Sequence, residues 1–422
     1  MSGKKYDNKG RLLRQGERQR EDGRYEYRYI DVAGKTRSIY SWRLVDTDKA
    51  PSGRSSPVSL REMEKQARRD VEDGVKSYTA VRTTLNDFYE SYMETKGRLK
   101  SSTRENYKYM YKKYVRDELG NRKIGAIKNS DIKKFYAHLI DEHGFAPNSM
   151  ENIHTILHPV FKQAVLDGYI RTNPTDEVMR DIKSSYDWQK KKRHALTKEQ
   201  QSAFISFIAA SKVYKHWLPL FTVLLGTGGR IGEIVGLRWQ DCDFDKGIIN
   251  INHSLIYRKS ENGTCCFQVT TPKTKAGIRQ IPMLSEVRNA LREEQLYQMR
   301  TGFNDTKIDG FSGFIFRNRY GDCLSPHCVN RAIERISRDY NAAETKLAEQ
   351  EKRVAVLLPH FSAHHLRHTF CTRFCENETN LKIIQEIMGH ADITTTMDVY
   401  NEATADEKAR SFANLEGKIK IS

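Results

Sequence analysis

Two stretches near the end of the chain decide what fold and chemistry to expect. They are HHLRHTF, at residues 364–370, and MGHADITTTMDVY, at residues 388–400. They supply His364, Arg367, His390 and Tyr400. His364 and Arg367 are three residues apart, so a helix would present both on one side. An arginine, two histidines and a tyrosine form a set that is suited to binding an anion and attacking it.

Two upstream motifs complete this set. TGGRIGEIVGLRW, at residues 227–239, supplies Arg230, with Glu233 one helical turn later to orient the arginine or the helix. TPKTKAGIRQIPM, at residues 271–283, supplies Lys273 and Lys275. We expect strands at residues 264–270 and 277–283, flanking a tight turn at residues 273–277. All these side chains fall in one large C-terminal region.

The combined set matches the needs of phosphodiester cleavage by a tyrosine. In-line attack on phosphorus builds negative charge on the non-bridging oxygens, and guanidinium groups such as Arg230 and Arg367 match that charge with paired hydrogen bonds. Histidines donate hydrogen bonds or move protons near neutral pH. A lysine can protonate the leaving 5′ oxygen, and nearby cations activate the Tyr400 phenol. The set needs neither a metal nor a cofactor, so none is expected.

Composition favours a nucleic-acid partner. The 422 residues carry a net charge of +17, with a pI near 9.4. Such a charge suits a polyanion through phosphate contacts and counterion release. An anionic membrane is the competing partner, but neither a basic amphipathic anchor nor a lipidation signal is visible. The sequence shows no long apolar run and no secretory signal, so we expect the protein in the cytoplasm.

Cysteine spacing does not predict a zinc site. The seven cysteines show no framework spacing. Cys323 and Cys328 superficially resemble a metal clip, but no second ligand pair has matching spacing. Cys371 and Cys375 are four residues apart and are typical of packing positions on a helix.

The first 76 residues predict a small DNA-binding module. Aromatic and charged residues alternate with period two at residues 25–30 and 37–42, around a turn signal at Gly34. This pattern predicts a small antiparallel sheet, which could contact DNA or simply pack on a helix. Ser59 and Glu62 predict a capping box at the start of that helix, and Gly74 its end.

The rest of the chain predicts a helical domain, a linker and a larger domain. Residues 81–182 show apolar residues at helical spacing, with Ser102 and Ser130 as N-caps and Gly120 and Gly144 as stops. Residues 183–194 contain the basic run 190–193 and predict an exposed linker. Residues 195–410 predict a mainly α domain with a small β-sheet, opened by a helix capped at Thr197. Residues 411–422 remain as a tail. The fold class is therefore α+β, with several domains.

These motifs together resemble the tyrosine recombinases of the phage-integrase family, and in particular the integrases of conjugative transposons of Gram-positive bacteria. The likeness rests on TGGRIGE, HHLRHT, MGH and DVY, in that order. It extends over nearly the whole chain. It implies an arm-type DNA-binding domain at residues 1–76, with a three-stranded sheet and a helix. It further implies a core-binding domain at residues 81–182 and a catalytic domain at residues 195–410.

The resemblance also implies a role for each candidate residue. Arg230 and Arg367 would clamp the scissile phosphate, His364 would accept or orient a proton, and His390 would hydrogen-bond the phosphate. Tyr400 would form a 3′-phosphotyrosine link and release a 5′ hydroxyl. Lys273 would be the general acid, with Lys275 as the alternative because the length of this hairpin varies within the family. Gly229 departs from the family pattern, as does the ten-residue spacing from His390 to Tyr400.

The activity implied is site-specific recombination for a mobile element, through both integration and excision. The implied partners are double-stranded DNA at core-type and arm-type sites, three further copies of the chain in a homotetramer, an excisionase and a host DNA-bending protein. No membrane partner is expected, and the place of action would be the bacterial cytoplasm at the nucleoid. Two alternatives remain, a type IB topoisomerase and a catalytically idle DNA-binding regulator. The full catalytic set disfavours the regulator, and the separate arm-binding module disfavours the topoisomerase.

Overall fold

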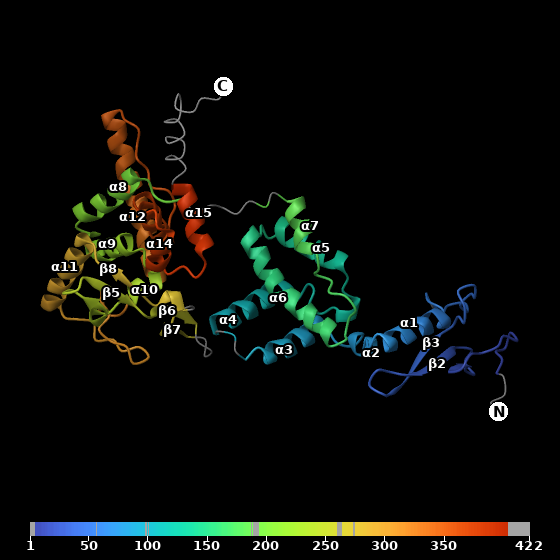
Figure 1. Cartoon of the computed structure of the whole chain (residues 1–422). Helices are drawn as coiled ribbons and strands as arrows, with labels where there is room; N and C mark the ends of the chain where they lie inside the picture. Colours follow the sequence, from blue (N-terminus) through green and yellow to red (C-terminus); the bar gives the residue numbers. More distant parts are fainter. Residues whose placement is uncertain are drawn as a thin grey trace, which may run out of the picture. The chain divides into compact units, whose positions relative to one another are not determined.

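The chain forms two compact units, each with its own buried core. The computed structural model describes residues 5–403 apart from residues 56, 98, 100, 187, 189–193, 260–263 and 273–274. The units are Met1–Lys191 and Lys192–Ser422 (Figure 1). Among the described residues, no helix combines the length and the apolar composition needed to cross a bilayer.

The N-terminal part of the first unit is an antiparallel sheet, as the alternating pattern predicted, and it has the three strands and the helix that the resemblance implied. The elements are β1 (Glu17–Gln19), β2 (Tyr25–Ile30), β3 (Thr36–Ser41) and α1 (Leu60–Glu72), with strand order β1-β2-β3. Tyr25 and Tyr27 on β2 are buried in one cluster with Leu44 and Leu60. Period-two alternation therefore places these tyrosines on the inner side of the sheet, where α1 packs on β2 and β3.

The outer face of this sheet is organised around one carboxylate. Glu26 is only 1% exposed. Its carboxylate accepts hydrogen bonds from Arg18, from Arg28 Nε at 3.2 Å and from Ser38 Oγ at 2.7 Å. Burial alone would raise the pKa of Glu26, but these donors hold it at about 2. Glu26 therefore remains charged and fixes the positions of the arginines that surround it.

Further arginines on this face lie over aromatic rings. The pairs are Arg20–Tyr40, Arg24–Tyr40, Arg24–Trp42 and Arg54–Trp42, with guanidinium carbons 5.4–5.7 Å from the ring centroids. These distances fall in the range of cation–π contacts. We refer to these residues, together with Arg18, Glu26 and Arg28, as the outer basic face.

The remainder of the first unit is helical. Its elements are α2 (Ser77–Ala80), α3 (Leu85–Thr95), α4 (Ser101–Met110), the π-helix η1 (Tyr111–Val115), the 3₁₀ turn η2 (Ile124–Ala126), α5 (Asn129–Asp141), α6 (Pro147–Leu166) and α7 (Val178–Ser185). Tyr136, Phe161 and Met150 are fully buried in its core. The basic run 190–193 of the predicted linker lies outside the described residues, and α7 extends into the start of that linker.

Several predicted helix caps are wrong. α1 begins after Ser59, but the Ser59 side chain makes no capping bond, so the predicted box with Glu62 does not form. α4 begins at Ser101 and α5 at Asn129, which places Ser102 and Ser130 inside helices. The Asp131 carboxylate accepts from the Lys128 backbone N–H at 2.8 Å and so satisfies the start of α5 instead. Of the predicted stops, Gly144 follows α5 in the left-handed region with φ of 60° and donates to the Ile140 carbonyl at 3.1 Å, as a helix stop does, and Gly120 lies beyond η1.

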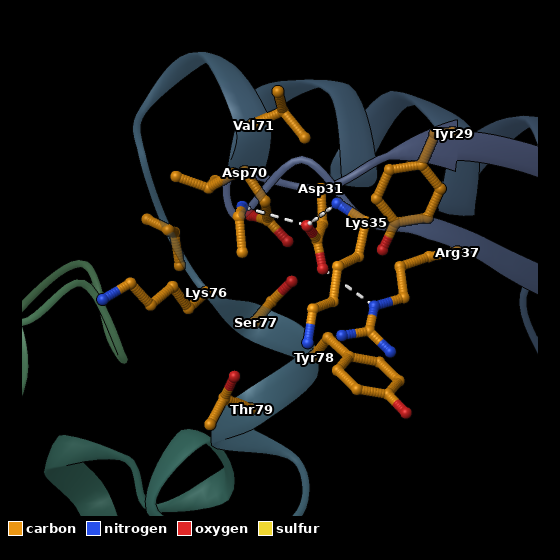
Figure 2. A pocket seen from close by; sticks show the side chains of 13 residues that line it. Tyr29, Asp31, Lys35, Arg37, Asp70, Val71, Lys76, Ser77, Tyr78 and Thr79 are labelled. Atoms are coloured by element: carbon orange, nitrogen blue, oxygen red, sulfur yellow. Dashed lines mark hydrogen bonds and ion pairs between the residues drawn. The ribbon is translucent and has the colours of Figure 1, made fainter.

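The sheet and the helical part of the first unit are joined by specific contacts. Arg171 bridges to Asp70 at 2.8 Å and to Asp73 at 2.9 Å at the end of α1. Beside this junction is a pocket of about 180 Å³, shown in Figure 2. On its wall, the Arg37 guanidinium lies 3.5 Å from the centre of the Tyr78 ring, and Asp31 holds Arg37 with a 2.8 Å ion pair.

The second unit combines helices with two small sheets. Its elements are α8 (Lys198–Ala210), η3 (Lys215–Trp217), α9 (Leu218–Thr227), α10 (Ile231–Val235), η4 (Trp239–Asp241), β4 (Cys242–Asp243), β5 (Ile248–Ile251), β6 (Ser254–Lys259), β7 (Cys265–Thr270), η5 (Lys275–Gly277), β8 (Arg279–Pro282), α11 (Ser285–Thr301), α12 (Pro326–Glu351), α13 (Ala363–Asn377), α14 (Leu381–Met388) and α15 (Ile393–Ala403). Thr197 caps α8 as predicted, in a capping box with Gln200.

One predicted pairing in this unit is wrong. β7 pairs with β6, whereas β8 pairs with β5 in the sheet β4-β5-β8. The two strands that flank residues 273–277 therefore belong to different sheets and do not form one hairpin. This connection carries Arg279 at the start of β8 into contact with α14, and thereby into the candidate site.

Candidate active site

Arg230 is placed by a turn that glycine permits. α9 ends at Thr227, and Gly228 follows in the left-handed region with φ of 60°. A Cβ on Gly228 would lie 2.3 Å from a Phe370 ring carbon, so the close approach to α13 requires glycine here. Arg230 then caps α10, with its backbone N–H and its Nη1 each 2.9 Å from the Glu233 carboxylate. The Arg230 side chain remains 42% exposed.

A second arginine, Arg279, shares the Glu233 carboxylate with Arg230, although no sequence motif indicated it. Arg279 Nη2 donates to Glu233 Oε2 at 2.8 Å, and both side chains are at most 5% exposed. Burial would raise the pKa of Glu233, but the bonds from Arg279 and Arg230 hold it below its ordinary value. Glu233 therefore orients two arginines at once, which extends the role expected from its spacing.

Arg367 enters from α13 and is almost fully buried. It is 4% exposed, and its Nη1 donates to the Gly228 carbonyl at 2.8 Å. Burial, together with the positive charges of Arg230 and Arg279, lowers the pKa of Arg367 to about 9. The guanidinium still carries its charge at neutral pH.

The three arginines converge on the C-terminus of α14. Arg279 Nε donates to the Ile387 carbonyl at 2.7 Å, Arg367 Nη2 to the Met388 carbonyl at 2.5 Å, and Arg230 Nη2 to the Gly389 carbonyl at 3.0 Å. The last carbonyls of a helix lack intrahelical partners and carry partial negative charge. Three consecutive carbonyls thus gather side chains that are far apart in the sequence.

His390 follows this helix end and joins the cluster. Gly389 adopts φ of 63°, which reverses the chain, and His390 Nδ1 then lies 2.9 Å from Thr396 Oγ1. Burial, together with the positive charges of Arg367, Arg230 and Arg279, lowers the pKa of His390 to about 4. The imidazole is therefore neutral at pH 7. Thr396 was not among the predicted site residues. Its position between His390 and Tyr400 was the signal that could have indicated it.

His364 and Tyr400 lie on the helices around this cluster. His364 is an exposed residue at the start of α13, close enough to His390 for their charges to interact. Tyr400 is half-buried on α15, which packs against α13 and α14. Its ring lies against the apolar cluster of Cys371, Cys375, Ile384 and Met388. The nucleophile candidate is thus held by the helices that carry Arg367 and precede His390.

The general-acid candidates cannot be placed in the same way. Lys273 lies outside the described residues. Lys275 begins the short turn η5, whose last residue, Gly277, accepts from Arg279 Nη1 through its carbonyl at 3.2 Å. Lys275 therefore lies four residues before Arg279 of the arginine cluster.

The electrostatics of the cluster favour an anion. Three guanidinium groups face a single carboxylate, so Arg230, Arg279, Arg367 and Glu233 together carry two positive charges in excess. An anion placed near these guanidinium groups would offset their mutual repulsion. This excess of positive charge lies beside the helix α15, which carries Tyr400.

Comparison with known proteins identifies the family. Residues 194–407 match the phage integrase family, residues 1–71 match the DNA-binding domain of Tn916 integrase, and residues 84–140 match the N-terminal SAM-like domain of phage integrases. The transposase from transposon Tn1545 of Streptococcus agalactiae serotype V is 36% identical over 416 residues, covering 98% of this chain and 97% of the relative. The transposase from Tn916 of Enterococcus faecalis shows the same identity and coverage.

More distant relatives and solved structures agree. The ICEBs1 integrase of Bacillus subtilis is 27% identical over 384 residues, covering 90% of this chain and 93% of the relative. A structure of the Tn1549 transposon integrase with transposon right end DNA superposes with a TM-score of 0.68 at 30% identity, covering 79% of this chain and all of that one. The chain therefore belongs to the phage integrase family. It is a site-specific DNA recombinase of the conjugative-transposon type, an enzyme that cuts and rejoins DNA strands.

Proposed function

We propose that Tyr400 cuts DNA by in-line attack on a phosphodiester that is held by Arg230 and Arg367. The attack forms a 3′-phosphotyrosine bond and releases a 5′ hydroxyl, and the reverse attack by a 5′ hydroxyl on another strand rejoins the DNA. The bond energy is kept in the phosphotyrosine, so the exchange needs no nucleotide hydrolysis. The observation that carries this proposal is the gathering of Arg230, Arg367 and His390 at the C-terminus of α14, against the helix that bears Tyr400.

The roles of the remaining groups follow from their surroundings. His390 is neutral at pH 7 and is oriented by Thr396 through Nδ1, so its other ring nitrogen is assigned to a non-bridging phosphate oxygen. His364, at the exposed start of α13, is assigned to the proton of the Tyr400 phenol. Glu233 and Arg279 position Arg230 without contacting DNA themselves.

Lys273 is proposed as the general acid that protonates the leaving 5′ oxygen, with Lys275 as the alternative. A substrate with a 5′-thio leaving group distinguishes them, because sulfur leaves without a proton. Lys273→Ala should lose cleavage of the ordinary substrate and regain it with the thio substrate. Rescue of Lys275→Ala in place of Lys273→Ala would move the assignment to Lys275.

At the level of assembly, we propose that the outer basic face binds arm-type DNA sites while the helical part of the first unit and the second unit bind core-type sites. Four copies of the chain would then exchange strands between two duplexes through a Holliday junction, in the bacterial cytoplasm at the nucleoid. An excisionase and a host DNA-bending protein are the proposed accessory partners for integration and excision. The near full-length likeness to transposon enzymes supports a recombinase over a topoisomerase or an idle regulator.

A nicked suicide substrate tests the chemistry directly. Loss of the short 3′ fragment after cleavage prevents rejoining, so wild-type protein should accumulate a covalent protein–DNA adduct. Peptide mapping should place the DNA on Tyr400, and Tyr400→Phe should bind the substrate without forming an adduct. An adduct that survives Tyr400→Phe, or its absence with wild-type protein that binds the substrate, would overturn the mechanism.

A further inference from the structure

A second cluster of chemically active side chains lies in the first unit, apart from the recombination site. Among the described residues, one group of three or more histidine, cysteine or acidic side chains has its donor atoms within 4.8 Å of one another, and it consists of Glu118, His138 and His143. Glu118 lies in the turn after the π-helix η1, His138 in the last turn of α5, and His143 just beyond α5. Two segments that are about 20 residues apart in the sequence therefore meet at these donors.

The distances within the cluster suit a tetrahedral ion. His138 Nε2 and Glu118 Oε1 are 3.2 Å apart. The pair is joined by a hydrogen bond. Zinc with bonds of about 2.0–2.1 Å sets neighbouring ligand atoms about 3.3 Å apart, so an ion that replaces the shared proton needs little movement of this pair. His143 completes the set with its donor inside the same 4.8 Å limit.

Aromatic neighbours hold the His143 ring in place. It makes edge contacts with the rings of Tyr114, Phe145 and His138, at centroid distances of 5.9, 6.5 and 5.4 Å. Tyr114 and Phe145 in turn pack edge to face at 4.7 Å. Ligands whose orientation is fixed by their neighbours bind a metal with less ordering cost, which is the role of outer-shell packing in known sites.

We propose that Glu118, His138 and His143 bind a divalent transition-metal ion, with zinc the best match and water as its fourth ligand. Two imidazoles and one carboxylate suit zinc, whereas magnesium and calcium prefer sites built from oxygen ligands alone. Glu118 and His138 are each 43% exposed, so the ion can enter from solvent. The bound ion ties the turn after η1 to the end of α5 and stabilises the helical part of the first unit.

An ordinary surface ion pair is the rival explanation, and the chain contains one for comparison. His360 Nε2 lies 4.0 Å from Glu334 Oε1, with the side chains 86% and 58% exposed. This pair offers the same residue types without a third ligand among the described residues. His360→Gln is therefore a matched control for His143→Gln.

The test uses the full chain after treatment with a chelator. Titration with zinc by calorimetry, and with cobalt by visible absorption, should show one tight site per chain in wild-type protein, with the intense bands of tetrahedral cobalt. His143→Gln should weaken zinc binding by more than about tenfold, since loss of even an outer-shell partner weakens affinity by about 10–100-fold. His360→Gln should leave the affinity unchanged, and magnesium should not compete.

Stability provides the second readout. Zinc should raise the melting temperature of the wild-type protein and of His360→Gln, because a ligand that binds only the folded state stabilises it. His143→Gln should melt like the wild type without zinc and gain little when zinc is added. Zinc that binds wild type and His143→Gln equally would mark an adventitious ion only, and it would overturn the site, as would no binding by the wild type.

Discussion

Glu233 and Arg279 form the more buried of the two ion pairs in the arginine cluster. Both are at most 5% exposed, and they are joined by a 2.8 Å ion pair. We expect Arg279→Met to lower the free energy of unfolding by about 3–5 kcal/mol, because it leaves the Glu233 carboxylate buried with Arg230 as its remaining cationic partner. Urea unfolding measures the loss, and cleavage of the suicide substrate should fall with it.

A double variant separates pairing from simple loss of packing. Glu233→Gln combined with Arg279→Met removes both charges, so it should unfold at higher urea than Arg279→Met alone. Cleavage should stay low in the double variant, because Arg230 loses its orienting carboxylate. Strictly additive losses of stability would contradict the view that these two groups act as a pair.

His390 gives the site a predictable response to acid. Burial and three neighbouring arginines lower its pKa from 6.5 to about 4. Between these values the unfolded chain takes up a proton that the folded chain does not, so the free energy of unfolding falls as the pH falls through this window. At about pH 5 the His390 contribution should amount to about 1–2 kcal/mol.

The comparison of wild type with His390→Gln isolates this effect from other histidines. His154 and His253 also have lowered pKa values because of burial, and they remain in both proteins. Urea unfolding at about pH 7.5 and pH 5 should show a smaller loss for His390→Gln than for wild type. An equal loss of unfolding free energy in wild type and His390→Gln would show that His390 titrates in the folded protein much as it does in the unfolded chain.

At the level of helices and strands, the sequence predicted element types better than element ends. The N-cap at Thr197 and the tyrosine alternation of β2 were confirmed because each depends on residues within one turn or one strand. The predicted N-caps at Ser102 and Ser130 were wrong, because serine is common at helix caps but is also tolerated inside helices. Which of several polar residues starts a helix depends on packing that a short window does not contain.

The same limit explains the errors around the active site. Arg230, Arg367 and His390 could be selected by motif, and the structure brings them together. Arg279 was missed because its partner Glu233 is 46 residues away. The prediction of a hairpin around residues 273–277 was wrong, because β8 pairs with β5 rather than with β7. The sequence did hold one signal for Arg279. It stands two residues before Ile281, on the same inward face of the strand, where a charged residue needs a buried partner.

The C-terminus of α14 is the element that holds the arginines together, which makes Gly389 sensitive. Its φ is 63°, and an added Cβ would lie 2.9 Å from the Ala276 carbonyl oxygen and 3.0 Å from Arg279 atoms. Gly389→Ala should therefore lower the free energy of unfolding by more than the roughly 1–2 kcal/mol of left-handed backbone alone. Cleavage should fall as well, because His390 and the carbonyl acceptors shift.

Gly74 provides the control for backbone strain. It follows α1 with φ of 70°, and a Cβ there would meet nothing within 4 Å. In urea unfolding, Gly74→Ala should lower the free energy of unfolding only by the cost of placing alanine in the left-handed backbone region. It should leave cleavage unchanged. Equal losses of unfolding free energy in Gly389→Ala and Gly74→Ala would mean that the close contacts around Gly389 contribute nothing.

Considered as a whole molecule, the chain carries two groups of arginines in different units. The outer basic face lies in the first unit, and the arginine cluster lies in the second. Arg20 and Arg28 on the outer basic face are 38% and 56% exposed and share the Glu26 carboxylate. If this face binds arm-type DNA, its arginines should set the salt dependence of that binding without affecting strand cleavage elsewhere.

The double variant Arg20→Ala and Arg28→Ala tests this separation. For each phosphate contact that is lost, the slope of log affinity against log salt should decrease by about 0.9 for an arm-type duplex. Cleavage of a core-type suicide substrate should be unchanged, because Arg230 and Arg367 are intact. Arg335→Ala with Arg338→Ala, which removes two exposed arginines from α12, should leave the arm-site slope as it is. A slope that changes equally in both double variants would show that net charge, rather than this face, attracts the DNA.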